Sequence, residues 1–142
     1  MLTHADKDHC TGFADLAEQV HIGELWVTPR LWRELGEGDS AVCEDARALH
    51  AEAERRVKAT IAAARRGERP ASGDKILIVG YDADHDEHSY AELPEECHTG
   101  PGHLITKLDG EELSAVFGAF IHGPFADDCD GDRNGTSCAQ RP

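Results

Sequence analysis

Apolar residues near the start of the chain follow first a helical and then a strand spacing. Phe13, Leu16 and Val20 recur at intervals of three and four, which predicts a short helix with Thr11 as its N-cap and Gly23 as its end. The residues that follow, ELWVTP, predict a brief buried strand, and RLWREL predicts a helical turn or two. The pattern therefore opens as helix, strand, helix.

The longest amphipathic stretch predicts the main helix, from Asp39 or Ser40 to about Arg66. Its apolar stripe consists of Val42, Ala46, Leu49, Ala53, Val57, Ile61 and Ala64. Glu52 stands four residues before Arg56, a spacing that places opposite charges next to each other on a helix surface. We expect the stripe to pack on a sheet and the charged face to meet solvent.

The second half of the chain changes character after one strongly apolar segment. KILIVGY (75–81) predicts a strand covered on both faces. The acidic, histidine-rich residues 82–103 are interpreted as a surface loop, and Asp109-Gly110 as a hairpin turn. AVFGAFIH (115–122) predicts another strand, and 123–142 an irregular C-terminal tail. The order of elements predicts an α/β fold with mixed strands and flanking helices.

Length, charge and cysteine content narrow the class of protein. With 142 residues, we expect one domain over 1–142. Fourteen basic against 28 acidic residues give a net charge of −14, which opposes a basic nucleic-acid surface. No apolar run approaches the roughly 20 residues of a membrane helix and no secretory signal is visible, so we expect a cytoplasmic protein without a membrane segment. Five cysteines without a CxxC pair favour free thiols.

The strongest chemical signal is the opening stretch LTHADKDHCTGF, residues 2–13, which holds His4, Asp6, Asp8 and His9. On an extended segment, side chains at every second position point to one side, and a turn at His9 would bring its imidazole to the same place. Imidazole and carboxylate suit zinc, manganese or iron, and four such groups exceed what one ion usually takes from so short a segment. A polar loop could hold these residues by chance, but their spacing favours a site for two metal ions.

The same stretch resembles the signature H-x-[HD]-x-D-H-x-x-G of metallo-β-lactamase-fold hydrolases, with Gly12 as its glycine. Aspartate at position 6, where the family more often has histidine, is similar to the branch found in competence-type DNA-uptake proteins. The resemblance implies a partial metallo-β-lactamase (αββα) fold, with the motif on a loop between a strand and a helix. It also implies a hydrolase in which a metal-activated hydroxide attacks a phosphodiester, ester or amide, so the substrate would be a small molecule or a phosphodiester held through the metal.

By this resemblance, His4 and Asp6 would bind the first of two zinc ions, with manganese or iron as alternatives. Asp8 and His9 would serve the second ion, and Asp8 would orient the attacking water as the catalytic residue. The family's later ligands, a Gly-Asp pair after an apolar strand and a His-His-Gly segment, have no good counterpart here. We therefore expect an incomplete domain, a fragment through truncation, frameshift or a misassigned start, with weak metal binding and little or no turnover.

A second, less specific resemblance lies in FIHGPFADDCDGDRNGTS. In the family, a strand ends there in a histidine-proline-like turn and an Asn followed by Thr-Ser leads to the next buried strand. The matching residues are Arg133, Asn134, Thr136 and Ser137. His122 stands at the predicted strand end and is a weaker candidate ligand.

Two other groups of residues leave a different class of protein open. Asp130, Asp132, Asn134 and Gly135 match the first half of an EF-hand loop, although Arg141 stands where the bidentate glutamate belongs. The alternative function is therefore a non-catalytic acidic metal-binding, calcium-binding or interaction module. A further cluster, Asp82, Asp84, His85, Asp86 and His88, is interpreted as adventitious metal-binding groups on a loop.

Overall fold

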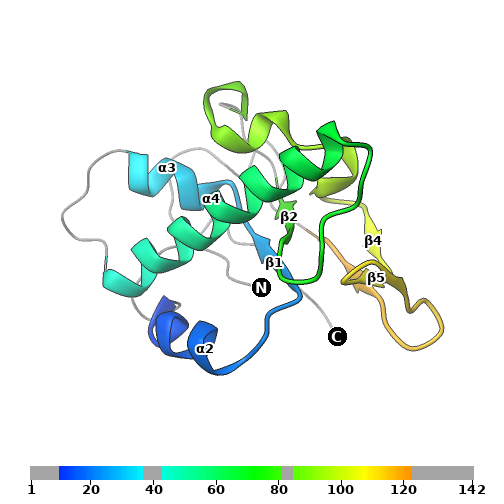
Figure 1. Ribbon diagram of the computed structural model, residues 1–142. Coiled ribbons are helices and arrows are strands. Elements are labelled where there is room, and N and C mark those ends of the chain that lie inside the picture. Colours follow the sequence, from blue (N-terminus) through cyan, green and yellow to red (C-terminus); the bar gives the residue numbers. More distant parts are fainter. Residues whose placement is uncertain (1–9, 37–42, 81–84, 123–142) are drawn as a thin grey trace.

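The computed structural model describes residues 10–36, 43–80 and 85–122, in which helices cover one face of a parallel sheet (Figure 1). The first half contains α2 (Phe13–Gln19), β1 (Glu24–Val27), α3 (Arg30–Gly36), α4 (Glu44–Arg65) and β2 (Lys75–Val79). The three-stranded sheet has the order β1-β2-β3, where β3 is His98–Thr99, and both neighbouring pairs are parallel. The α/β class predicted from the sequence is confirmed.

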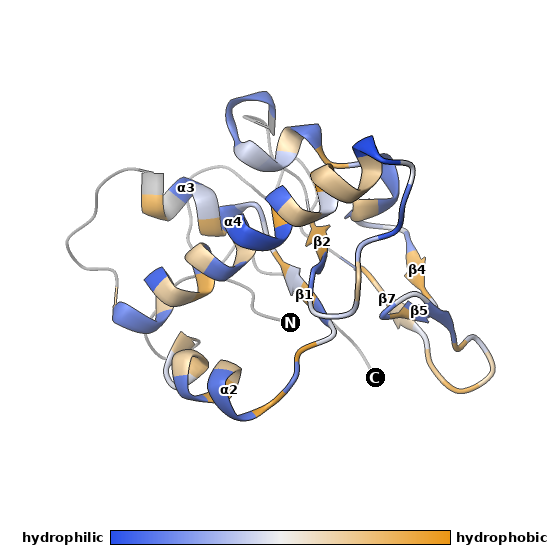
Figure 2. Cartoon of the chain, viewed as in Figure 1, coloured by the Kyte–Doolittle hydropathy of each residue, from blue (hydrophilic) through white to orange (hydrophobic). Residues whose placement is uncertain are grey.

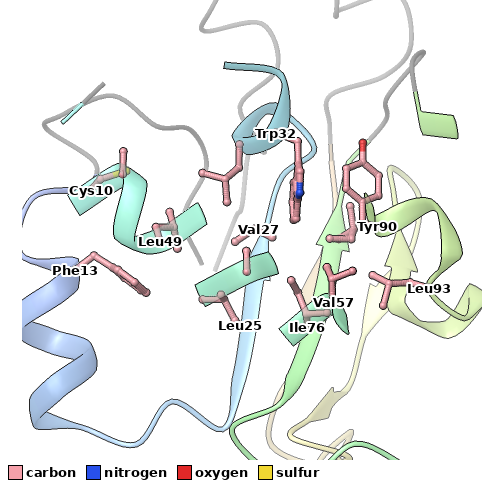
Figure 3. Packing of buried hydrophobic residues seen from close by; sticks show 14 residues of the cluster. Cys10, Phe13, Leu25, Val27, Trp32, Leu49, Val57, Ile76, Tyr90 and Leu93 are labelled. Atoms are coloured by element: carbon pink, nitrogen blue, oxygen red, sulfur yellow. The ribbon is translucent and has the colours of Figure 1, made fainter. Parts of the chain in front are cut away.

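Helix α4 covers the sheet because both surfaces are apolar where they meet (Figure 3). Leu25 and Val27 of β1 and Ile76 and Ile78 of β2 point to this face, as the two-residue period of a strand requires. Opposite them, the buried stripe of α4 consists of Ala46, Leu49, Ala53, Val57, Thr60 and Ala63. The main core thus lies between α4 and the β1–β2 pair, with α2 and α3 closing its sides.

Two short antiparallel pairs lie on the other side of the sheet. They are β4 (Leu104–Ile105) with β7 (Ala119–Phe120), and β5 (Lys107–Leu108) with β6 (Glu111–Glu112). Ile105 and the fully buried Ile121 pack there against Leu77 and Val79 of β2. Figure 2 shows β2 as an apolar strand. Other side chains pack on both of its faces, in agreement with its predicted burial.

Helix α2 confirms the predicted helix but differs from it at its start. The N-cap is Gly12, with φ 87° and ψ 4°, and not Thr11. Phe13 is buried in the core, whereas Leu16 and Val20 are about half exposed, at 50% and 48%. The predicted stripe overstated the buried face because only the first turn of this short helix reaches the core.

Helix α4 starts later than its sequence pattern suggested. Its N-cap is Cys43, so the predicted start at Asp39 or Ser40 was too early, and those two positions lie outside the described residues. The end agrees, with Arg66 as the C-cap and Gly67 next to it. The predicted pairing of Glu52 with Arg56 is confirmed, with Nε and Oε1 2.7 Å apart.

The interpretation of 82–103 as a surface loop is wrong in part. Residues 85–103 contain three short 3-10 helices, η1 (His85–Glu87), η2 (Ser89–Glu92) and η3 (Glu95–Cys97), followed by β3. Tyr90 is fully buried and Leu93 is 6% exposed, because both fill the core beside Trp32 and α4. Because the residues around Tyr90 and Leu93 in the sequence are acidic or histidine, the pattern did not predict that these two side chains are buried.

The hairpin turn at Asp109-Gly110 is confirmed. Both residues have positive φ, 50° and 86°, as a two-residue turn between antiparallel strands requires. The strand predicted over 115–122 shrinks to β7, and Val116 is 84% exposed. Pairing with the two-residue β4 limits how far β7 extends.

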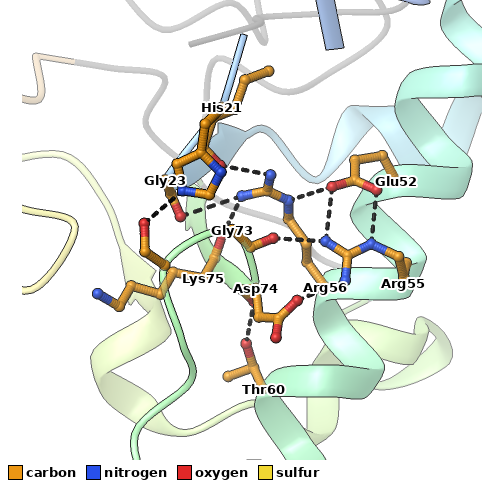
Figure 4. Close-up of polar contacts among 11 residues, drawn as sticks. His21, Gly23, Glu52, Arg55, Arg56, Thr60, Gly73, Asp74 and Lys75 are labelled. Atoms are coloured by element: carbon orange, nitrogen blue, oxygen red, sulfur yellow. Dashed lines mark hydrogen bonds and ion pairs between the residues drawn. The ribbon is translucent and has the colours of Figure 1, made fainter. Parts of the chain in front are cut away.

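A buried arginine holds α4 to the sheet (Figure 4). The side chain of Arg56 is only 4% exposed and donates to the backbone oxygens of Ile22 at 2.8 Å and Lys75 at 3.0 Å. Its Nε donates to Glu52. Ile22 and Lys75 stand at the amino ends of β1 and β2, so one guanidinium fixes the helix over the start of both strands.

Replacing Arg56 should therefore destabilise the fold strongly. In Arg56→Met the two carbonyl oxygens lose their side-chain donor in a buried place, which we expect to lower the free energy of unfolding by about 3 kcal/mol. The neighbouring Arg55 also binds Glu52, but its side chain is 49% exposed. Arg55→Met is the matched control, with an expected loss of less than about 1 kcal/mol. Urea unfolding of both variants measures the difference, and equal losses would contradict the assignment.

Candidate metal-binding site

The four predicted ligands His4, Asp6, Asp8 and His9 lie outside the described residues, which begin directly after them at Cys10. Cys10 is 1% exposed and belongs to the main core. It forms no disulfide, and neither do Cys43 and Cys97 among the described cysteines. The first described residue after the four predicted ligands is thus part of the core.

The glycine of the motif has a conformational role. A Cβ placed on Gly12 would meet no atom within 4 Å, so space does not require glycine here. The backbone conformation requires glycine instead, because residues with a side chain rarely adopt the left-handed φ of 87° found at Gly12. The chain turns sharply at Gly12 and enters α2 at once, and the carbonyl of Gly12 accepts from the Leu16 N–H at 3.0 Å.

The start of α2 is capped from another helix. The carboxylate of Asp45, in the first turn of α4, accepts hydrogen bonds from the backbone N–H groups of Gly12 at 3.0 Å and Ala14 at 3.1 Å. Both hydrogen bonds lower the pKa of Asp45 below its usual value, and the one from Ala14 contributes most. A glycine N-cap offers no side-chain acceptor, and Asp45 supplies it.

The parallel strands all end at one edge of the sheet, here called the carboxyl edge. Four residues join α2 to β1, and the two elements run in opposite directions (Figures 1 and 3). Gly80, directly after β2, donates to the Thr99 carbonyl at 2.9 Å at this edge. Open α/β sheets commonly bind ligands at this edge.

A hollow of about 860 Å³ begins at the residues that follow the motif. Cys10, Thr11 and Gly12 line it, together with Trp26 and Phe117. The two aromatic rings meet edge to face with centroids 6.4 Å apart. The hollow is large enough for a small organic group, and His21, Glu24 and Asp109 add polar groups to its lining.

Three residues of catalytic type meet near the amino end of the sheet, yet their connectivity does not make a hydrolytic triad. The Ser72 hydroxyl donates directly to Asp109 Oδ2 at 2.5 Å, and His21 Nε2 lies 2.9 Å from the same hydroxyl oxygen. In a triad, histidine stands between serine and the acid and takes the serine proton. Here the hydroxyl proton goes to the carboxylate. Lys75, whose Nζ lies 2.7 Å from Oδ1, and then Ser72 lower the pKa of Asp109, so this cluster latches the hairpin to the sheet.

A second polar cluster ties α3, α4 and η2 together. Trp32 Nε1 donates to Glu54 Oε1 at 2.5 Å, and the Ser89 hydroxyl donates to the same oxygen. Burial alone would raise the pKa of Glu54, but these hydrogen bonds outweigh it and the pKa is lowered. His50 lies edge to face against Trp32, and burial lowers its pKa despite the nearby Glu54 carboxylate. The cluster acts as a brace between these three elements.

The remaining candidate ligands stay apart or lie outside the structure's range. His88 stacks on the buried Tyr90 ring, with centroids 5.3 Å apart, and Asp86 is exposed. His122 is exposed beside Phe120. Asp82, Asp84, Asp130, Asp132, Arg133, Asn134, Gly135, Thr136 and Ser137 all lie outside the described residues. Over residues 10–36, 43–80 and 85–122, no three His, Cys, Asp or Glu side chains gather in a way that could hold a metal ion.

Sequence reasoning missed the residues that support the site. Asp45 has the signal of an acid in the first turn of a helix, which indicates dipole compensation for its own helix and not a cap for another. Burial raises the pKa of the Cys97 thiol to about 11, with further contributions from Glu96 and Glu24, which disfavours the thiolate form at neutral pH. Neither role has a local spacing that would identify it.

Comparisons with models of known protein families, with curated protein sequences and with solved structures found no match for this chain. Of the helices in the described part, none is both long and apolar enough to cross a membrane.

The lowered pKa of His50 predicts a pH dependence of stability. A histidine whose folded pKa lies below its unfolded value near 6.5 binds protons more readily when the chain is unfolded. The free energy of unfolding should therefore fall as the pH drops through about 6.5, and less so in His50→Gln. Urea unfolding of both proteins at pH 7.5 and 5.5 tests this, and an identical pH change in the two would contradict it.

Proposed function

We propose that this chain carries the first metal-binding motif of a metal-dependent hydrolase of the metallo-β-lactamase superfamily. The observation that carries the proposal is the stretch LTHADKDHCTGF, whose histidine and aspartate spacing matches the family signature through Gly12. The elements after the motif support it. A helix, α2, follows directly after the motif's glycine, as the resemblance implies for the carboxyl side of the loop.

The proposed ligands have the donor chemistry that such a site needs. His4 and Asp6 would hold one ion and Asp8 and His9 the other, with zinc expected and manganese or iron as alternatives. When bound, the metal would supply a hydroxide nucleophile at neutral pH and stabilise charge on a phosphodiester, ester or amide. Asp8 would orient the attacking water. The apolar hollow that begins at Cys10 is where we place an organic part of the substrate.

The expected activity is low. Four residues supply two ligands for each of two ions, while a catalytic zinc normally takes three from protein. The described residues hold no cluster that adds the missing ligands. We therefore expect weak, specific metal binding by this chain with little turnover.

The double variant Asp8→Ala/His9→Ala should abolish specific zinc uptake, because it removes the proposed second-ion ligands. Metal content after equilibrium dialysis against zinc measures the uptake. A matched control, Asp86→Ala/His88→Ala, removes the same residue types from the other histidine cluster and should keep the wild-type stoichiometry.

Unchanged zinc uptake in the Asp8→Ala/His9→Ala variant would contradict the proposal. Calcium uptake that disappears in Asp130→Ala/Asp132→Ala, in a chain that takes up no specific zinc, would favour the non-catalytic acidic module instead.

A further inference from the structure

We propose that the free edge of β1 binds an extended segment of a partner protein, an apolar run flanked by lysine or arginine, as an additional strand of the sheet. Strand β1 stands at one end of the order β1-β2-β3 (Figure 1). Over residues 10–36, 43–80 and 85–122, no backbone hydrogen bond joins Glu24–Val27 to any segment other than β2. Unpaired backbone groups at a sheet edge are a template for another strand. The inference does not depend on the proposed function, and a strand bound here would compete with a substrate in the same hollow.

The hollow of about 860 Å³ lies beside this edge, in the plane of the sheet. Every residue from His21 to Trp26 lines it, so it follows β1 along its length. Leu25 points to the face of the sheet that α4 covers and Trp26 to the opposite face, yet both line the hollow. A space that reaches both faces of a strand surrounds its edge. This is where the next strand of a sheet would lie, about 4.8 Å from β1.

Apolar side chains bound the hollow on both sides of the sheet plane. Helix α2 supplies Phe13 and Leu16 on the side of α4, while Phe117 and Ala119 lie on the other side. Leu16 is 50% exposed because α2 packs chiefly against α4. A strand added to β1 would place alternate side chains against α2 and against Phe117. The incoming segment should therefore be apolar at successive positions, as a strand covered on both faces is.

The charges at the hollow favour basic residues beside that apolar run. Glu24 lines the hollow, and its Oε2 accepts the backbone N–H of Asp109 at 2.7 Å, whereas its Oε1 has no hydrogen-bond donor within the described part of the chain. The exposed Asp15 and Glu18 stand on the same helix as Leu16. A lysine or arginine of the partner can bind these carboxylates. A second copy of the chain has the same net charge of −14, which opposes it as the occupant.

The first test uses the full chain and a short synthetic peptide in which valine and isoleucine form a run between lysines. The peptide should slow amide hydrogen exchange at Glu24–Val27, and the effect should saturate with peptide concentration. The control peptide has the same side chains with an N-methyl group on each residue of the run. It should bind at least about tenfold more weakly, because its backbone cannot donate hydrogen bonds to β1.

Protein variants then distinguish the edge of β1 from other apolar surfaces. Leu16→Glu places a charge on the wall of the hollow and should weaken peptide binding at least about tenfold. Val20→Glu makes the same change at a side chain that is 48% exposed and does not line the hollow, and it should bind as the wild type does. Glu24→Gln keeps an acceptor for the N–H of Asp109 and should weaken binding about threefold. Glu111→Gln, at an exposed position of β6, is its control.

Unchanged exchange at Glu24–Val27 with excess peptide would overturn the inference. Equal affinity for the N-methylated peptide would also do so, since the hollow would then bind apolar groups and not a strand. This comparison needs only the wild-type chain, so it decides the matter even if Leu16→Glu does not fold. Equal losses in Leu16→Glu and Val20→Glu would contradict the site. If sedimentation equilibrium of the peptide-free chain shows a dimer that Leu16→Glu dissociates, a second copy occupies the edge and the proposed partner is wrong.

Discussion

The described structure depends on one buried cation. Arg56 reaches from the middle of α4 to the backbone at the amino ends of β1 and β2, and Glu52 completes its hydrogen bonding (Figure 4). A buried guanidinium is costly unless its donors are used, so the native arrangement is held to the one in which they are. This fixes where α4 crosses the sheet. About three helical turns earlier on the same helix, Asp45 holds the start of α2. One helix therefore connects the sheet with the segment that follows the proposed metal-binding motif.

Regular elements could be predicted where a single local rule decides the outcome. The strand KILIVGY, the Asp109-Gly110 turn and the end of α4 near Arg66 follow from continuous apolarity, positive φ and a glycine stop. The errors came where tertiary contacts decide. Tyr90 is buried although its neighbours in the sequence are acidic and histidine residues. It is buried because its ring packs against that of Trp32, with centroids 4.6 Å apart. The pattern of residues around Tyr90 in the sequence does not predict this contact with Trp32.

The candidate site divides in the same way. Its proposed chemistry is local, since His4, Asp6, Asp8 and His9 lie within six positions, and it stays a prediction because these residues lie outside the described range. Its support is not local: Asp45 meets Gly12 from 33 positions away. The spacing of Ser72, His21 and Asp109 likewise says nothing of which atom donates to which, and only the geometry distinguishes a latch from a triad. Ligand types can be predicted from a sequence, whereas the frame around them needs the fold.

The buried thiol of Cys10 can report on the local stability of the segment around it. Cys10 lies in the core and is 1% exposed, so a reagent reaches its thiol only when the segment around it opens. The rate at which Cys10 is alkylated would thus measure local opening of this segment, on a free-energy scale separate from global unfolding. The alkylation rate of this one thiol would therefore give the free energy of local opening without an added label.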